Sequence, residues 1–154
     1  MNNLRFSILF VLLSAIFSGC AATYKAPEMT PLKIEENING SKVKLFVATK
    51  KVLINEGFAI KYSDENTGTI STSPKLVELD DTMANCGTTA GMPALSSLKI
   101  SGKIALDLVT DTNKISITAS VYGEDVRRNA DVTCISTGTV EKDLIQKIKI
   151  KMSQ

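Results

Sequence analysis

In two segments of the chain, apolar residues recur at helical spacing. Each segment is therefore predicted to form an amphipathic helix that packs on a core. The first covers residues 41–57, with Ser41 suited to cap its N-terminus and Gly57 placed where a left-handed residue ends a helix. Its buried stripe is expected to comprise Leu45, Phe46, Ala48, Thr49, Val52 and Leu53. The second lies at the C-terminus, and its stripe is expected to comprise Val140, Leu144, Ile145, Ile148 and Met152. Three hydroxyl residues precede this stripe and are candidate N-caps: Ser136, Thr137 and Thr139.

Between these helices the apolar pattern changes to a period of two, which predicts β-strands. In the first of them, Phe58, Ile60 and Tyr62 are expected to share one face, and a turn in the sequence SDENTG makes a hairpin with the next strand. Gly102 lies inside a later strand and predicts a bend or bulge there. The expected strands cover residues 58–62, 69–73, 75–79, 98–108, 115–121 and about 126–135.

This order of elements predicts an α+β fold. We expect one antiparallel sheet of about five or six strands, with the N-terminal-side helix and the C-terminal helix packed on one face. The polar segment 80–97 is expected to be a long, mobile loop between strands. Its glycines, Gly87 and Gly91, do not make a phosphate-binding loop, because the lysine and hydroxyl of that motif are missing.

The N-terminus has the pattern of a secretory signal peptide. Arg5 is the only charged residue before Lys25, and an apolar run follows it at residues 6–17. This run is shorter than the roughly 20 residues that span a membrane as a helix. It ends in the sequence FSGC, which resembles the lipobox of bacterial lipoproteins, where cleavage precedes a cysteine that becomes acylated. The resemblance implies lipidation of Cys20, and a residue other than aspartate at position 21 implies export to the outer membrane. The alternative is ordinary secretory cleavage near Ala21 or Ala22.

We therefore divide the chain into a lipoprotein signal peptide at 1–19, a lipidated tether at 20–39 and a single α+β periplasmic domain at 40–154. Acylation of Cys20 leaves Cys86 and Cys134, which are expected to form a disulfide in an oxidising compartment. Their pairing closes a loop worth about 4 kcal/mol in the chain-entropy model. The other interpretation of this pair is two free catalytic thiols.

The composition argues against several classes of function. The 18 lysines and arginines nearly balance the 16 acidic residues, which disfavours nucleic acid as a partner. The sequence has no histidine, which excludes Ser-His-Asp and Cys-His catalysis and every histidine-containing metal site within this chain. Three acidic pairs lie in predicted turns and are expected to bind local backbone: Asp64-Glu65, Asp80-Asp81 and Glu124-Asp125. We expect no catalytic residue, no metal and no cofactor.

Residues 52–73 and 134–148 carry a further resemblance. A helix that ends at Gly57 leads into an aromatic strand and a glycine-turn hairpin, and Cys134 precedes the last helix through Ser136 and Gly138. This pattern resembles helix-grip domains of small outer-membrane lipoproteins, such as the C-terminal part of the BamC (NlpB) family, and it transfers no active-site residue. Three functions stay open: a non-enzymatic protein-interaction or structural module with an unidentified envelope partner, a carrier of a small apolar ligand or lipid between sheet and helix, and a carboxylate enzyme.

Overall fold

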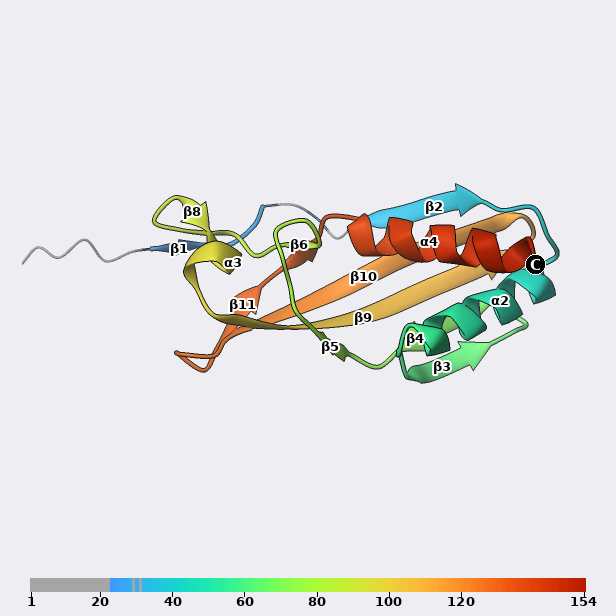
Figure 1. Ribbon diagram of the computed structural model, residues 1–154, viewed down its shortest axis with the longest axis horizontal. Coiled ribbons are helices and arrows are strands. Elements are labelled where there is room, and N and C mark those ends of the chain that lie inside the picture. The colour runs from blue at the N-terminus through green and yellow to red at the C-terminus, as the bar shows by residue number, and fades with distance from the viewer. Residues whose placement is uncertain (1–22, 29, 31) are drawn as a thin grey trace, which may run out of the picture.

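The computed structural model describes residues 23–28, 30 and 32–154, so the predicted signal peptide and Cys20 lie outside the described residues. The described chain has an α+β fold built on a seven-stranded antiparallel sheet (Figure 1), two small sheets and three helices. Five strands of the large sheet lie in the order β11-β10-β9-β4-β3, while β2 also pairs with β10 and β5 with β9. The sheet therefore has more strands than the five or six expected. Their bounds are β2 Lys33–Asn37, β3 Ile60–Asp64, β4 Thr69–Thr72, β5 Lys75–Val77, β9 Ile100–Asp111, β10 Lys114–Asp125 and β11 Ala130–Thr133.

Strand β2 corrects the expected tether, because residues 33–37 belong to the sheet. The strand pairs antiparallel with the first five residues of β10. Glu35 lies between Lys114 and Lys33, with Oε–Nζ distances of 2.6 and 2.7 Å. The ion pairs with Lys114 and then Lys33 lower the pKa of Glu35 to about 2. The sequence KIEEN gives no strand pattern, because Ile34 is the only apolar residue in it. Backbone pairing with β10 holds the strand in place.

The centre of the fold is the long hairpin of β9 and β10, twelve residues in each strand. The pairing is continuous from Asp111↔Lys114 to Ile100↔Asp125, so the bulge expected at Gly102 is absent. A side chain at Gly102 would instead overlap Leu79, since a Cβ there would lie 2.2 Å from the Leu79 Cγ. Inward residues of the two strands form the core floor: Ile104, Leu106, Leu108, Ile115, Ile117 and Ala119.

Two helices cover this inner face (Figure 1): α2, Lys42–Asn55, contacts β9, and α4, Thr139–Met152, contacts β10. The predicted stripe of α2 is buried, and Ser41 caps the helix as expected, its Oγ accepting from the Lys44 N–H at 3.4 Å. Gly57 has a φ of +77° after the helix end. The predicted cap of α4 is wrong: Gly138 is the N-cap.

A bulge in β3 corrects the predicted face of Tyr62. The pairing with β4 shifts between Ile60 and Tyr62, so Tyr62 lies opposite Ser71, whose hydroxyl donates to the Asp107 carboxylate on the uncovered face. Tyr62 is consequently 55% exposed instead of packing with Phe58 and Ile60. One inserted residue reverses the face of every following side chain.

Segment 80–97 is organised, contrary to the expected mobile loop. Its strands β7 and β8 form a small sheet with β1 at one end of the molecule (Figure 1), and its strand β6 pairs with β12. Helix α3, Ala94–Ser97, follows β8. The strand expected at 126–135 is split by Cys134 into β11 and β12. The bounds are β1 Tyr24–Lys25, β6 Ala84–Asn85, β7 Thr88–Thr89, β8 Met92–Pro93 and β12 Ile135–Ser136.

Candidate functional site

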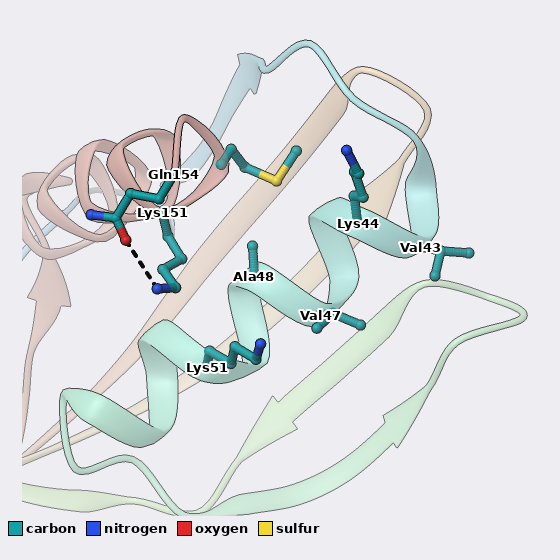
Figure 2. Close-up of a pocket in the computed structure, with 8 residues that line it drawn as sticks. Val43, Lys44, Val47, Ala48, Lys51, Lys151 and Gln154 are labelled. Atoms are coloured by element: carbon teal, nitrogen blue, oxygen red, sulfur yellow. Dashed lines mark hydrogen bonds between the residues drawn. The ribbon is translucent and has the colours of Figure 1, made fainter.

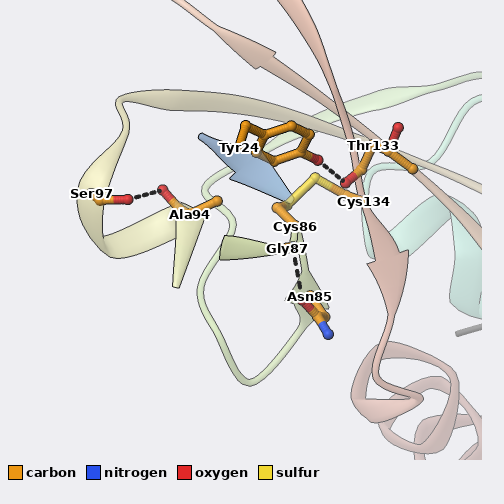
Figure 3. Close-up of a disulfide and its surroundings, with 8 residues drawn as sticks. All are labelled: Tyr24, Asn85, Cys86, Gly87, Ala94, Ser97, Thr133 and Cys134. Atoms are coloured by element: carbon orange, nitrogen blue, oxygen red, sulfur yellow. Dashed lines mark hydrogen bonds between the residues drawn. A yellow bond between two sulfur atoms is a disulfide. The ribbon is translucent and has the colours of Figure 1, made fainter. Parts of the chain in front are cut away.

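The structure joins Cys86 to Cys134, matching the pair that the sequence predicts (Figure 3), with an S–S distance of 1.98 Å and a sequence separation of 48. Both cysteines are buried, at 2% and 7% exposure. The Tyr24 hydroxyl donates to the Thr133 carbonyl at 3.1 Å beside the bridge, and burial raises the pKa of Tyr24. A buried bridge between two small pairings is a structural cross-link, because a redox-active pair must be reachable by its exchange partner.

One carboxylate of each acidic pair that was a candidate for catalysis accepts hydrogen bonds from nearby backbone, although Glu124 and Asp125 lie at the end of β10 and not in the predicted turn. The Asp80 carboxylate accepts from the Thr82 and Met83 N–H groups at 2.8 and 3.0 Å. Bonding to Thr82 lowers the pKa of Asp80. The Asp64 carboxylate accepts from the Asn66 N–H at 2.9 Å, and Asp125 accepts from the Arg127 N–H at 3.0 Å. These bonds serve the turns. In the part of the chain that the structure describes, no three Cys, Asp or Glu side chains gather in a metal-binding group.

Glu141 is a buried carboxylate that the sequence analysis missed. Strands β2 and β11 both pair with the edge of β10 opposite β9, and they leave a gap at residues 119–121. Glu141 fills this gap: its Oε1 accepts from the Ala119 N–H at 3.2 Å and its Oε2 from the Ser136 hydroxyl at 2.7 Å. The side chain is fully buried. Its sequence signal is an acidic residue in the first turn of a helix, where the N-terminal dipole favours a negative charge.

The two long helices enclose an open groove of about 320 Å³ at the C-terminal end of α4 (Figure 2). We call it the helix groove, and it is lined by Val43, Lys44, Val47, Ala48, Lys51, Lys151, Met152 and Gln154. A second hollow of about 280 Å³ adjoins it, since both share Lys151 and Gln154. Val43 and Val47 are 52% and 39% exposed, so the groove offers apolar surface to solvent.

The charged side chains that line the helix groove are all lysines. Lys44 and Lys51 extend from α2, and Lys151 extends from α4, where its Nζ donates to the Gln154 amide oxygen at 3.0 Å (Figure 2). Across the described residues, no carboxylate forms an ion pair with any of these three lysines, in contrast to Lys147, which pairs with Glu56 at 2.9 Å. The groove thus combines an apolar floor with three lysines that form no ion pair within the described residues.

The space between the helices and the sheet is filled by side chains. Leu45 and Leu53 of α2 and Ile145 and Ile148 of α4 are at most 1% exposed. The helix groove lies outside this layer, between exposed residues of the two helices. Within residues 23–28, 30 and 32–154, no helix has the length and apolar character needed to cross a membrane.

No protein-family model matches this sequence, and no curated protein matches it. The chain is similar in structure to a DUF4468 family protein from Bacteroides ovatus, with a TM-score of 0.51 and 11% identity over 84% of this chain and 91% of that chain. A TBP-like protein from Parabacteroides distasonis aligns with a TM-score of 0.45 and 18% identity over 83% of this chain and 88% of that chain. The first similarity shows a shared fold and nothing about activity.

Proposed function

We propose that the protein is a non-enzymatic module of the bacterial cell envelope, anchored to the outer membrane by lipid on Cys20, that faces the periplasm and binds another envelope protein through the helix groove. The anchor rests on the sequence around Cys20. The buried Cys86–Cys134 bridge supports an oxidising compartment such as the periplasm.

The observation that carries the binding role is the exposed apolar surface of the helix groove. Large apolar side chains that stay exposed together, rimmed by charge, are typical of interaction sites. Ile54 and Ile150, at 59% and 60% exposure, add apolar surface on the same two helices. One carboxylate of each acidic pair accepts a hydrogen bond from local backbone, which favours a structural role for these pairs over a catalytic one.

The filled layer between helices and sheet favours this role over the carrier of an apolar ligand. A carrier of that kind needs a cavity in which most of the ligand surface is buried. Leu53 of α2 and Leu106 of β9 both belong to the hydrophobic core and are fully buried. Native mass spectrometry of detergent-free protein separates the two functions, since a bound lipid would favour the carrier.

Site-specific photo-crosslinking in intact cells tests the binding role. A photoreactive amino acid replaces Val47 in the helix groove or, as a control, Val109 on the uncovered sheet face; these side chains are 39% and 46% exposed. We expect a discrete adduct with one envelope protein from position 47 and none from position 109. The proposal fails if position 47 gives no adduct, or if both positions give the same products.

The anchor is tested separately by Cys20→Ser, which should move the protein from the membrane fraction to the soluble periplasmic fraction. Continued tight association of this variant with membranes would contradict lipid anchoring and leave the groove experiment unaffected. About 0.8 kcal/mol per buried CH₂ group makes two or more acyl chains a firm anchor, so the change in fractionation should be nearly complete.

A further inference from the structure

We infer that the segment bound in the helix groove is an acidic amphipathic helix of the partner, an inference that rests on the proposed binding role. The groove follows α2 from Val43 to Lys51, about 12 Å along the helix axis, and the adjoining hollow continues to Asn55, about 18 Å in all. A partner helix of about three to four turns matches this combined length. Such a helix binds in a groove through apolar residues on one face, spaced at i, i+3, i+4 and i+7.

The lysines at the groove favour an acidic partner. α2 contains four lysines and no acidic residue between Lys42 and Asn55. Lys44 and Lys51 lie two turns apart on the groove side, and Lys151 faces them from α4 (Figure 2). Carboxylates on the flanks of a bound helix could pair with all three, while a basic segment would meet like charge at each.

Because the groove has an apolar floor, the bound acidic helix also needs an apolar face to pack against it. Val43, Val47 and Ala48 follow the groove side of α2 at spacings of four and one residues, and Met152 closes the floor from α4. The unbranched, flexible side chain of Met152 can adapt to partner side chains of several shapes. Surface charge pairs alone contribute little affinity, so burial of this floor must supply most of it.

The fold places the groove away from the predicted anchor. β1 begins only four residues after Cys20 and lies at one end of the elongated molecule, while the C-terminus and the groove-forming end of α4 lie at the other (Figure 1). A basic apolar surface can also bind an anionic membrane. Because the anchored end is the opposite one, we favour a protein segment over the membrane that holds the lipid.

The test uses the mature chain, with its disulfide oxidised, and a synthetic 16-residue helical peptide. The peptide carries leucine at i, i+3, i+4 and i+7 positions, glutamate at the others and a fluorophore at one end. A second peptide replaces every glutamate by lysine. Fluorescence anisotropy should give at least tenfold tighter binding of the acidic peptide, and equal binding of the two peptides would overturn the inference.

Charge reversal then locates the site. The triple variant Lys44→Glu, Lys51→Glu and Lys151→Glu should weaken binding of the acidic peptide at least tenfold. Unchanged affinity in this variant would overturn the assignment to the groove. Thermal unfolding of the variant checks that it is folded, and Val47→Asp provides an independent disruption of the apolar floor if it is not.

The matched control changes the same net charge elsewhere. The control triple variant reverses three exposed lysines that lie outside the groove: Lys61→Glu, Lys99→Glu and Lys103→Glu. It should change the affinity less than threefold. An equal loss in both triple variants would mean that net charge alone attracts the peptide, and would overturn a specific site.

Vesicles of phosphatidylglycerol provide the competing outcome. If the groove variant loses vesicle binding while the acidic peptide binds neither protein, the surface is a membrane contact and the inference is wrong. Failure of this inference differs from failure of the proposed function. A crosslinked envelope protein from position 47, together with no preference for the acidic peptide, keeps the binding role and rejects only the chemistry of the partner.

Discussion

Replacing Glu141 with alanine should be among the most destabilising single substitutions in the domain. Glu141 is fully buried and accepts hydrogen bonds from the Ala119 N–H and the Ser136 hydroxyl. A hydrogen bond to a charged group contributes about 1.5–3 kcal/mol, and a buried donor left without a partner costs about 1–3 kcal/mol. The cost of burying the carboxylate offsets part of this loss. We expect the Glu141→Ala variant to lose about 3–5 kcal/mol of unfolding free energy.

The glutamine variant distinguishes shape from charge. Glu141→Gln keeps the size of the side chain and one acceptor oxygen, so we expect a loss of about 1–2 kcal/mol. Ser136→Ala, alone and combined with Glu141→Ala, measures the coupling of this pair, which should be about 1 kcal/mol or more. Glu65→Ala, in an exposed turn, is the control and should change stability by less than about 0.5 kcal/mol.

Urea unfolding of the oxidised protein, followed by far-ultraviolet circular dichroism, gives these free energies by linear extrapolation. A loss below about 1 kcal/mol in Glu141→Ala, at an unchanged m-value, would refute the structural role of the carboxylate. A glutamine variant as unstable as the alanine variant would refute the argument from retained shape and hydrogen bonding.

Three further predictions concern stability. Replacing Cys86 and Cys134 together by alanine should lower the free energy of unfolding by about 4 kcal/mol in the chain-entropy model, as measured by urea unfolding against the oxidised protein. A reduced wild-type protein as stable as the oxidised one would contradict this. The folded pKa of Glu35 is about 2 and its ordinary value is 4.5. Its contribution to the free energy of unfolding is therefore complete above pH 4.5 and is lost as the pH falls towards 2. The Glu35→Gln variant should show a weaker dependence of stability on pH over that interval. Thr72→Val should cost about 1–3 kcal/mol, because it leaves the buried Leu106 N–H without its 2.9 Å acceptor; a thermal melt unchanged by the substitution would count against this.

The elements that the sequence predicts well are those whose signal is local. The stripe of α2 and the long alternation in β9 and β10 depend only on each element's own spacing. The structure buries the whole α2 stripe and alternate residues of both strands, such as Leu106 and Ile117. The disulfide follows from counting: once Cys20 is assigned to lipid, Cys86 and Cys134 are the remaining pair.

The elements that the sequence misses depend on partners far along the chain. β2 has one apolar residue and forms because β10 offers it an edge. The face of Tyr62 depends on a one-residue bulge against β4, which no alternation reveals. The hydroxyls of Thr137 and Thr139, expected at the cap of α4, donate to the Thr82 carbonyl. The helix groove could not be predicted, because it exists only where two helices about 90 residues apart come together.

The helix groove depends on how firmly α4 is held, and α4 is fixed along its length. Glu141 fixes its first turn to β10, Ile148 packs in the core, and Lys147 forms ion pairs with Asp143 and with Glu56 at the end of α2. Bonding to Asp143 and then Glu56 raises the pKa of Lys147, as expected where two carboxylates stabilise its charged form. A groove between helices held in this way is preorganised, so a partner pays little conformational cost to enter it. The affinity should therefore depend mainly on how well the partner complements the groove. For this reason, reversing the charge of the groove lysines tests binding more directly than destabilising the fold that supports the groove.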